Sequence, residues 1–180
     1  MIGISRNSAV LALAFTCALS PVTPSRAADA CELVTKTELE ATFDGTFLEG
    51  VGTSEGNATH CLYVGDDMFS FIVMVSNTTL PAGLELAAWH AQRKAAVQKA
   101  CQDVPGTAAG AAFQIVSDLG EEAYVCAADS KIGPIQAGGT TSLHAAKGPN
   151  IVQIDTSSRA PEMVEKLSNL VRTAFSRLPQ

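Results

Sequence analysis

The alternation of apolar and polar residues predicts strands in two separate parts of the chain. In the first part it predicts a hairpin with strands at 58–64 and 68–76, joined by a turn at Gly65, Asp66 and Asp67. The strand at 68–76 is apolar at odd and even positions alike, which predicts a central strand covered on both faces. The second part contains four further strand candidates, at 112–117, 122–128, 141–147 and 150–156.

Helical periodicity marks two shorter segments near the ends of the chain. Thr35 and Glu38 have the spacing of a capping box, so a helix is predicted over 36–43. The C-terminal segment carries an apolar stripe that is expected to lie on the sheet, formed by Val164, Leu167, Val171, Ala174 and Leu178.

The longest helix candidate is the segment 80–106. Pro81 lies near its first turn, and Pro105 and Gly106 lie beyond its end. Its expected sheet-facing line is rich in alanine, which permits close packing, and consists of Leu84, Ala88, Ala91 and Ala95. His90 on this helix is expected to be exposed or at a rim.

Short turns within strand pairs and helices between them predict an α+β fold. We expect an antiparallel sheet of about six strands, packed by the long central helix and the C-terminal helix. Phe47 and Leu48 add a short strand candidate before the first hairpin.

The first 27 residues have the three-part layout of a secretory signal peptide. Arg6 precedes an apolar run at 9–19, which is too short to span a bilayer, and small residues follow. Cleavage is expected after Ala27, with Ala30 as the alternative. The remaining 28–180 are expected to form one domain in the periplasm or outside the cell, with no transmembrane segment.

Charge narrows the classes of partner. The chain carries 12 Lys and Arg against 18 Asp and Glu, and loss of Arg6 and Arg26 with the signal changes its net charge from −6 to −8. This acidity argues against binding to nucleic acid or to anionic membrane surfaces.

Cys17 leaves with the signal, and four cysteines remain. An even number in an exported chain predicts two disulfides, for which three connectivities exist. The order of elements favours Cys31 with Cys61 and Cys101 with Cys126, because each bridge then joins a helix end to the sheet. Lipidation of Cys31 is disfavoured by the polar, proline-containing residues before it, and the absence of C-x-x-C spacing disfavours zinc or a redox pair.

Several short motifs together resemble a known group. They are a cysteine before "ELVTKTELEA", "CLYV", "LGEEAYV" at 119–125 and "AKGPNIVQI" at 146–154. The chain resembles small exported bacterial proteins and lipoproteins of unknown function, best known from actinobacteria. It is similar to the extracellular sensor domains of mycobacterial serine/threonine receptor kinases. This resemblance implies a disulfide-stapled α+β fold and ligand sensing, and it carries over no catalytic residue.

Catalytic and metal motifs are missing from the sequence, so neither a cofactor nor a catalytic residue is predicted. His60 with Asp66 and Asp67 is the one local cluster, although acidic residues at a turn are ordinary turn chemistry. His144 is expected on the second face of its strand, exposed or under a helix.

We therefore expect a non-enzymatic domain that binds a small ligand or an envelope partner protein. Two alternatives remain: a hydrolase assembled from His60, His144, Asp66 and Asp67, and a structural envelope protein.

Overall fold

The computed structural model describes residues 28–66, 69–103, 111–132, 135–158, 160 and 162–178, without the side chains of 130–137. The predicted signal peptide, Asp67, Met68, Pro105 and Gly106 lie outside the described residues.

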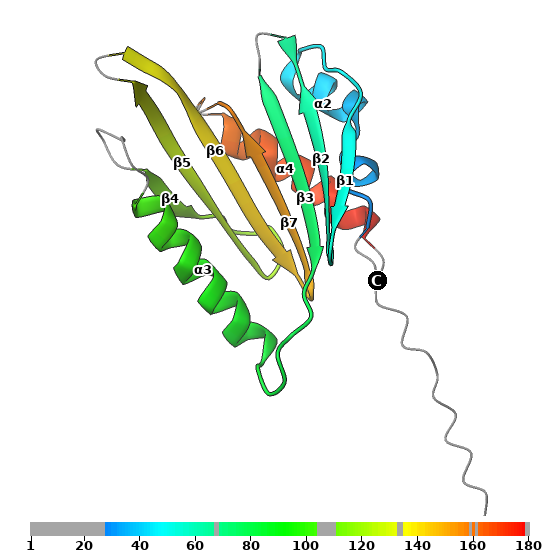
Figure 1. The fold of residues 1–180 in the computed structure, drawn as a ribbon, viewed down its shortest axis with the longest axis vertical. Helices are drawn as coiled ribbons and strands as arrows, with labels where there is room; N and C mark the ends of the chain where they lie inside the picture. Colours follow the sequence, from blue (N-terminus) through cyan, green and yellow to red (C-terminus); the bar gives the residue numbers. More distant parts are fainter. Residues whose placement is uncertain are drawn as a thin grey trace, which may run out of the picture.

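The expected antiparallel α+β fold is confirmed, but its sheet has seven strands rather than about six. Their order across the sheet is β1-β2-β3-β7-β6-β5-β4 (Figure 1). The strands are β1 (Val51–Glu55), β2 (Ala58–Val64), β3 (Ser70–Asn77), β4 (Ala112–Ile115), β5 (Glu122–Ile132), β6 (Ile135–Lys147) and β7 (Asn150–Thr156).

The additional strand, β1, is an exposed edge strand. None of its five residues is buried, and its sequence VGTSE accordingly shows no alternation of apolar and polar residues. It forms through a tight turn at Gly56 and Asn57, where Gly56 has φ +59°. The strand candidate at Phe47 and Leu48 is only an isolated bridge between Phe47 and Gly65.

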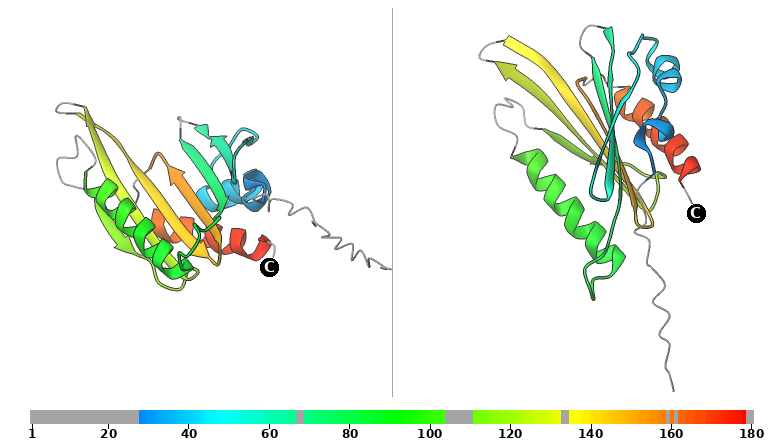
Figure 2. Two further views of the ribbon diagram at one scale, coloured as in Figure 1. Left: turned by 60° about the horizontal axis from the view of Figure 1, so that its bottom comes forward. Right: turned by 45° about the vertical axis from the view of Figure 1, so that its right-hand side comes forward.

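One face of the sheet, which we call the inner face, holds the hydrophobic core. Three helices cover it: α1 (Ala30–Leu33), α2 (Lys36–Phe43) and α4 (Met163–Arg177). The right-hand view of Figure 2 shows these helices on one side of the sheet and α3 (Leu86–Gln102) on the other. The predicted stripe of α4 is confirmed, since Leu167, Val171 and Ala174 are fully buried. The helix 36–43 also has its predicted bounds.

The second face, the outer face, is covered only in part. Helix α3 packs mainly on β4 and β5, and Figure 1 shows it away from β1–β3. The prediction that β3 is covered on both faces is therefore wrong. Phe71 and Val73 are buried on the inner face, whereas Ile72 between them is 40% exposed on the outer face.

Helix α3 also presents a different face from the one predicted. Ala88, Ala91 and Ala95 are exposed, while His90 and Cys101 are buried against the sheet. His90 is only 5% exposed and its ring nitrogen Nε2 lies 3.2 Å from the carbonyl oxygen of Gly148, so the prediction that His90 is exposed or at a rim is wrong. Alanine offers little apolar area, and larger side chains on the other faces of α3 decide which face is buried.

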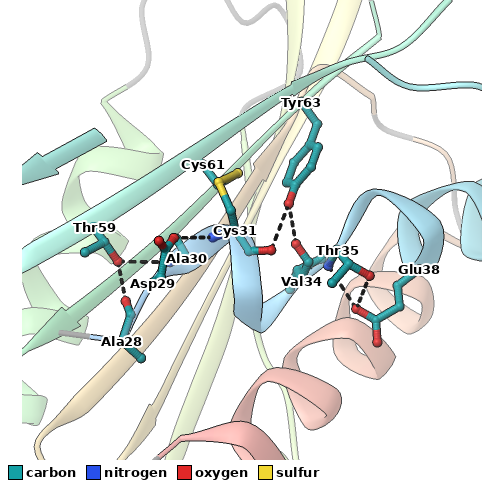
Figure 3. Close-up of a disulfide and its surroundings, with 10 residues drawn as sticks. All are labelled: Ala28, Asp29, Ala30, Cys31, Val34, Thr35, Glu38, Thr59, Cys61 and Tyr63. Carbon is teal, nitrogen blue, oxygen red and sulfur yellow. Dashed lines mark hydrogen bonds between the residues drawn. A yellow bond between two sulfur atoms is a disulfide. The ribbon is translucent and has the colours of Figure 1, made fainter. Parts of the chain in front are cut away.

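Both predicted disulfides are present. Cys31–Cys61 ties α1 to β2, and Cys101–Cys126 ties the end of α3 to β5. Figure 3 shows how the first bridge is supported. The Tyr63 hydroxyl donates to the carbonyl oxygen of Val34, and the Thr59 hydroxyl oxygen accepts from the Ala30 N–H at 3.1 Å.

None of the helices in the described part of the chain combines the length and apolar character needed to cross a membrane.

Candidate functional site

Four large apolar side chains lie next to one another on the uncovered half of the outer face. Val51 faces Leu62 across β1 and β2, and Leu62 faces Ile72 across β2 and β3. Val64 follows Leu62 on the same face of β2. The exposed fractions of Val51, Leu62, Val64 and Ile72 are 63%, 40%, 36% and 40%. We call these four residues the open strip.

The four residues of the open strip indicate an interaction site because they are adjacent to one another. Single exposed apolar residues are normal on protein surfaces, whereas adjacent ones mark interaction sites. Successive residues of a strand point to opposite faces, so the residues of β2 and β3 that do not face the core point outward. Several of these outward residues are apolar, and α3 does not reach them. The strip is therefore a surface that the fold leaves without a partner.

The open strip continues into polar residues of β7 and β6. Ile72 faces Asp155, and Asp155 faces Ser142. The Ser142 hydroxyl donates to one carboxylate oxygen of Asp155, and the Gln153 side-chain amide donates to the other at 2.8 Å. Asp155 is thus held in one orientation beside the apolar strip.

A histidine and an arginine complete this polar network under α3. Ser142 Oγ lies 3.0 Å from Nε2 of His144, and Arg93 lies 3.4 Å from Nδ1 of the same ring. Since the Ser142 proton goes to Asp155, His144 Nε2–H donates to Ser142 and Nδ1 faces the guanidinium. The His144 ring stacks on Tyr124, with ring centroids 5.1 Å apart.

The electrostatics of the network keep His144 neutral. Burial, and secondly the charge of Arg93, lower the pKa of His144 to about 4. Burial also raises the pKa of the Tyr124 hydroxyl, although Arg93 opposes that change. At neutral pH the imidazole of His144 is therefore neutral.

This arrangement does not match a serine hydrolase. In a Ser-His-Asp triad the carboxylate orients the histidine, which then takes the serine proton as a base. Here the carboxylate of Asp155 contacts Ser142, and an arginine faces the second nitrogen of His144. The lowered pKa makes the ring a weak base, so the network is suited to fixing Asp155 rather than to activating Ser142.

The structure does not bring the predicted hydrolase residues together. His60 and His144 share one row on the outer face, but Met74 and Gln153 lie between them. Three strand spacings of about 4.8 Å separate their backbones by roughly 14 Å. Of the two places predicted for His144, exposed or under a helix, the structure shows the second.

Asp66 serves the turn after β2. Its N–H donates to the carbonyl oxygen of Thr46 at 3.2 Å, and its own carbonyl oxygen accepts from the Phe69 N–H at 3.3 Å. Both contacts are made by the backbone of Asp66, so they place the residue in a turn, and the interpretation of its side chain as a turn acceptor stays a prediction. Asp67 lies outside the described residues.

No group of three or more His, Cys, Asp or Glu side chains in the described ranges is placed to hold a metal ion. Comparison with protein-family models, curated proteins and solved structures found no match. The resemblance to exported sensor domains therefore stays a prediction.

The site residues that sequence reasoning missed are Arg93, Ser142, Gln153 and Asp155. One signal for them was present in the strand 150–156, where Gln153 and Asp155 alternate with buried Val152 and Ile154. That alternation indicates a polar outer face. It does not show that β3 lies beside β7, because the pairing of β3 with β7 joins segments about 80 residues apart.

Proposed function

We propose that this protein is an exported, non-enzymatic domain that binds a partner polypeptide on the open strip. The observation that carries the proposal is the row of exposed Val51, Leu62 and Ile72 on the half of the outer face that none of the described helices covers. A polypeptide fits this surface better than a small molecule, because small-molecule sites enclose most of their ligand.

Export is supported by two observations, and a third bears on the position of cleavage. The first 27 residues have the layout of a signal peptide, and two disulfides suit an oxidising compartment. In addition, Asp29 caps α1 and Ala30 is buried, which favours cleavage before Ala28 over cleavage after Ala30 (Figure 3). Intact mass of protein recovered from an exporting host should show an N-terminus at Ala28. A retained segment 1–27 or a lipid on Cys31 would contradict this.

The binding proposal is tested by site-specific photo-crosslinking in that host. A crosslinking residue at Leu62 should capture a polypeptide, whereas the same residue at Ala91, exposed on α3, should not. The captured polypeptide, once identified and purified, should bind the wild type at least about tenfold more tightly than a Leu62→Thr, Ile72→Thr variant. Threonine keeps strand preference while removing apolar area. Equal crosslinking at both positions, or equal affinity for both proteins, would refute the proposal.

A further inference from the structure

A shallow depression adjoins the open strip on the outer face. Its volume is about 340 Å³, and Ile72 of the strip forms part of its wall. The other lining residues are mostly hydroxyl-bearing, namely Ser70, Thr140, Thr141, Ser142, Thr156 and Ser157, with Asp155 as the one charged side chain. The depression therefore offers a carboxylate surrounded by hydrogen-bonding groups, directly beside an apolar surface.

Asp155 keeps binding capacity in this position. It accepts one hydrogen bond on each carboxylate oxygen, from Ser142 and Gln153, whereas a carboxylate has about four acceptor positions. None of the ion pairs in the described part of the chain involves Asp155, and Arg93 is separated from it by His144 and Ser142. Asp155 is thus a pre-oriented anion that no described cation neutralises.

The surroundings of the open strip are acidic. The chain contains no lysine or arginine from Thr37 to Gln92, a range that includes β1, β2 and β3. Glu55 lies on the same face of β1 as Val51, and Asp155 lies beside Ile72 at the other side of the strip. An apolar centre with a rim of one charge sign favours a partner of the opposite sign.

We propose that the partner segment is basic and extended, that its apolar side chains cover the open strip, and that one lysine or arginine enters the depression to pair with Asp155. This inference rests on the proposed function and specifies the chemistry of its partner. A second copy of the chain would place two acidic surfaces against each other, and anionic lipid would be repelled. A basic polypeptide is the occupant whose charge complements this face.

The test titrates isotope-labelled mature protein with short synthetic peptides and follows backbone amide shifts by NMR. In three peptides valine alternates with lysine, serine or glutamate, and in a fourth serine alternates with lysine. The valine and lysine peptide should bind most tightly and shift amides of β2, β3 and β7. Asp155→Asn, which keeps the size of the side chain, should weaken it about 1.5- to fivefold, the usual range for a partly exposed charge pair. Glu165→Gln, exposed on α4, should have no effect.

The outcomes separate this inference from the proposed function. If the valine and serine peptide binds as tightly as the basic one, and Asp155→Asn changes nothing while Leu62→Thr, Ile72→Thr abolishes binding, the strip binds polypeptide but the basic chemistry is wrong. If the serine and lysine peptide binds as tightly as the valine and lysine peptide, the attraction is charge alone and both proposals fail. Both also fail if no peptide shifts these amides. Shifts on β2 and β3 that depend only on protein concentration would identify a second copy as the occupant and overturn the inference.

Discussion

At the scale of single residues, His144 couples the polar network to pH. Its pKa is lowered from 6.5 to about 4 in the folded protein, so the unfolded chain binds a proton in a range where the folded chain does not. The free energy of unfolding is therefore unaffected by protonation of His144 well above pH 6.5 and decreases as the pH falls from 6.5 towards 4. At pH 4.5 the expected loss is about 2 to 3 kcal/mol relative to pH 7.

A substitution isolates this contribution from that of the carboxylates. Urea unfolding of the wild type and of His144→Gln at pH 7 and 4.5 measures how much unfolding free energy each loses at the lower pH. The loss in His144→Gln should be smaller than in the wild type by about 2 to 3 kcal/mol. His60→Gln is the matched control, because it removes a histidine from the same face that lies outside the polar network. Identical pH dependence in His144→Gln and wild type would refute the assigned pKa.

Residue-level prediction of buried faces was right for the C-terminal helix, whose stripe contains large apolar side chains, and wrong for α3, whose predicted face is mostly alanine. Leu167 and Val171 were placed correctly because each hides much apolar area. Ala91 and Ala95 were placed wrongly, since the face of α3 is fixed by His90, the disulfide at Cys101 and contacts made by Arg93. Partners of polar residues distant in sequence are not encoded in local periodicity.

At the scale of elements, α3 is held to the sheet by little buried surface and therefore depends on its disulfide, whereas α4 is held by its buried side chains. Helix α3 buries only His90 and Cys101 completely, and its remaining sheet contacts include the Lys94–Glu122 ion pair at 3.1 Å. Helix α4, by contrast, buries seven residues. A Cys101→Ser, Cys126→Ser variant should therefore lose about 3 kcal/mol of unfolding free energy and show accelerated amide exchange in α3.

The second disulfide supplies the control for this experiment. A Cys31→Ser, Cys61→Ser variant removes a loop of similar length, 30 against 25 residues, and should accelerate exchange in α1 while leaving α3 unchanged. Hydrogen exchange with mass spectrometry distinguishes the two patterns. Uniform acceleration along the chain in both variants would show that neither bridge secures a particular helix.

Element prediction followed the strength of the local signal. The helix 36–43 was found with its correct bounds because Thr35 and Glu38 mark its start, and the Glu38 carboxylate accepts from the Thr35 N–H at 2.9 Å. Strand β1 was missed because its five exposed residues have no apolar face to reveal it. The open strip was missed with it, since the apolar outer side of β3 was assigned to a helix that does not cover it.

At the scale of the whole molecule, neither of the two disulfides in the described residues joins the two halves of the sheet. Cys31–Cys61 lies on the side of β1–β3, and Cys101–Cys126 lies on the side of β4–β7. The halves meet where β3 pairs with β7, and one continuous core runs beneath both. Within that core α4 contacts β6 and β7 as well as α1 and α2, so its packing couples the halves.

Truncation of one buried side chain in α4 should therefore destabilise both halves together. Because Leu167 is fully buried, the Leu167→Ala substitution should lower the free energy of unfolding by about 2 to 5 kcal/mol. Fluorescence and circular dichroism should both report the same single unfolding transition. Leu62→Thr on the open strip should cost less than about 1 kcal/mol, because that side chain is already 40% exposed. Two separated transitions in Leu167→Ala would mean that the halves unfold independently. A large loss for Leu62→Thr would mean that the open strip stabilises the fold, and its apolar residues would then no longer call for a partner.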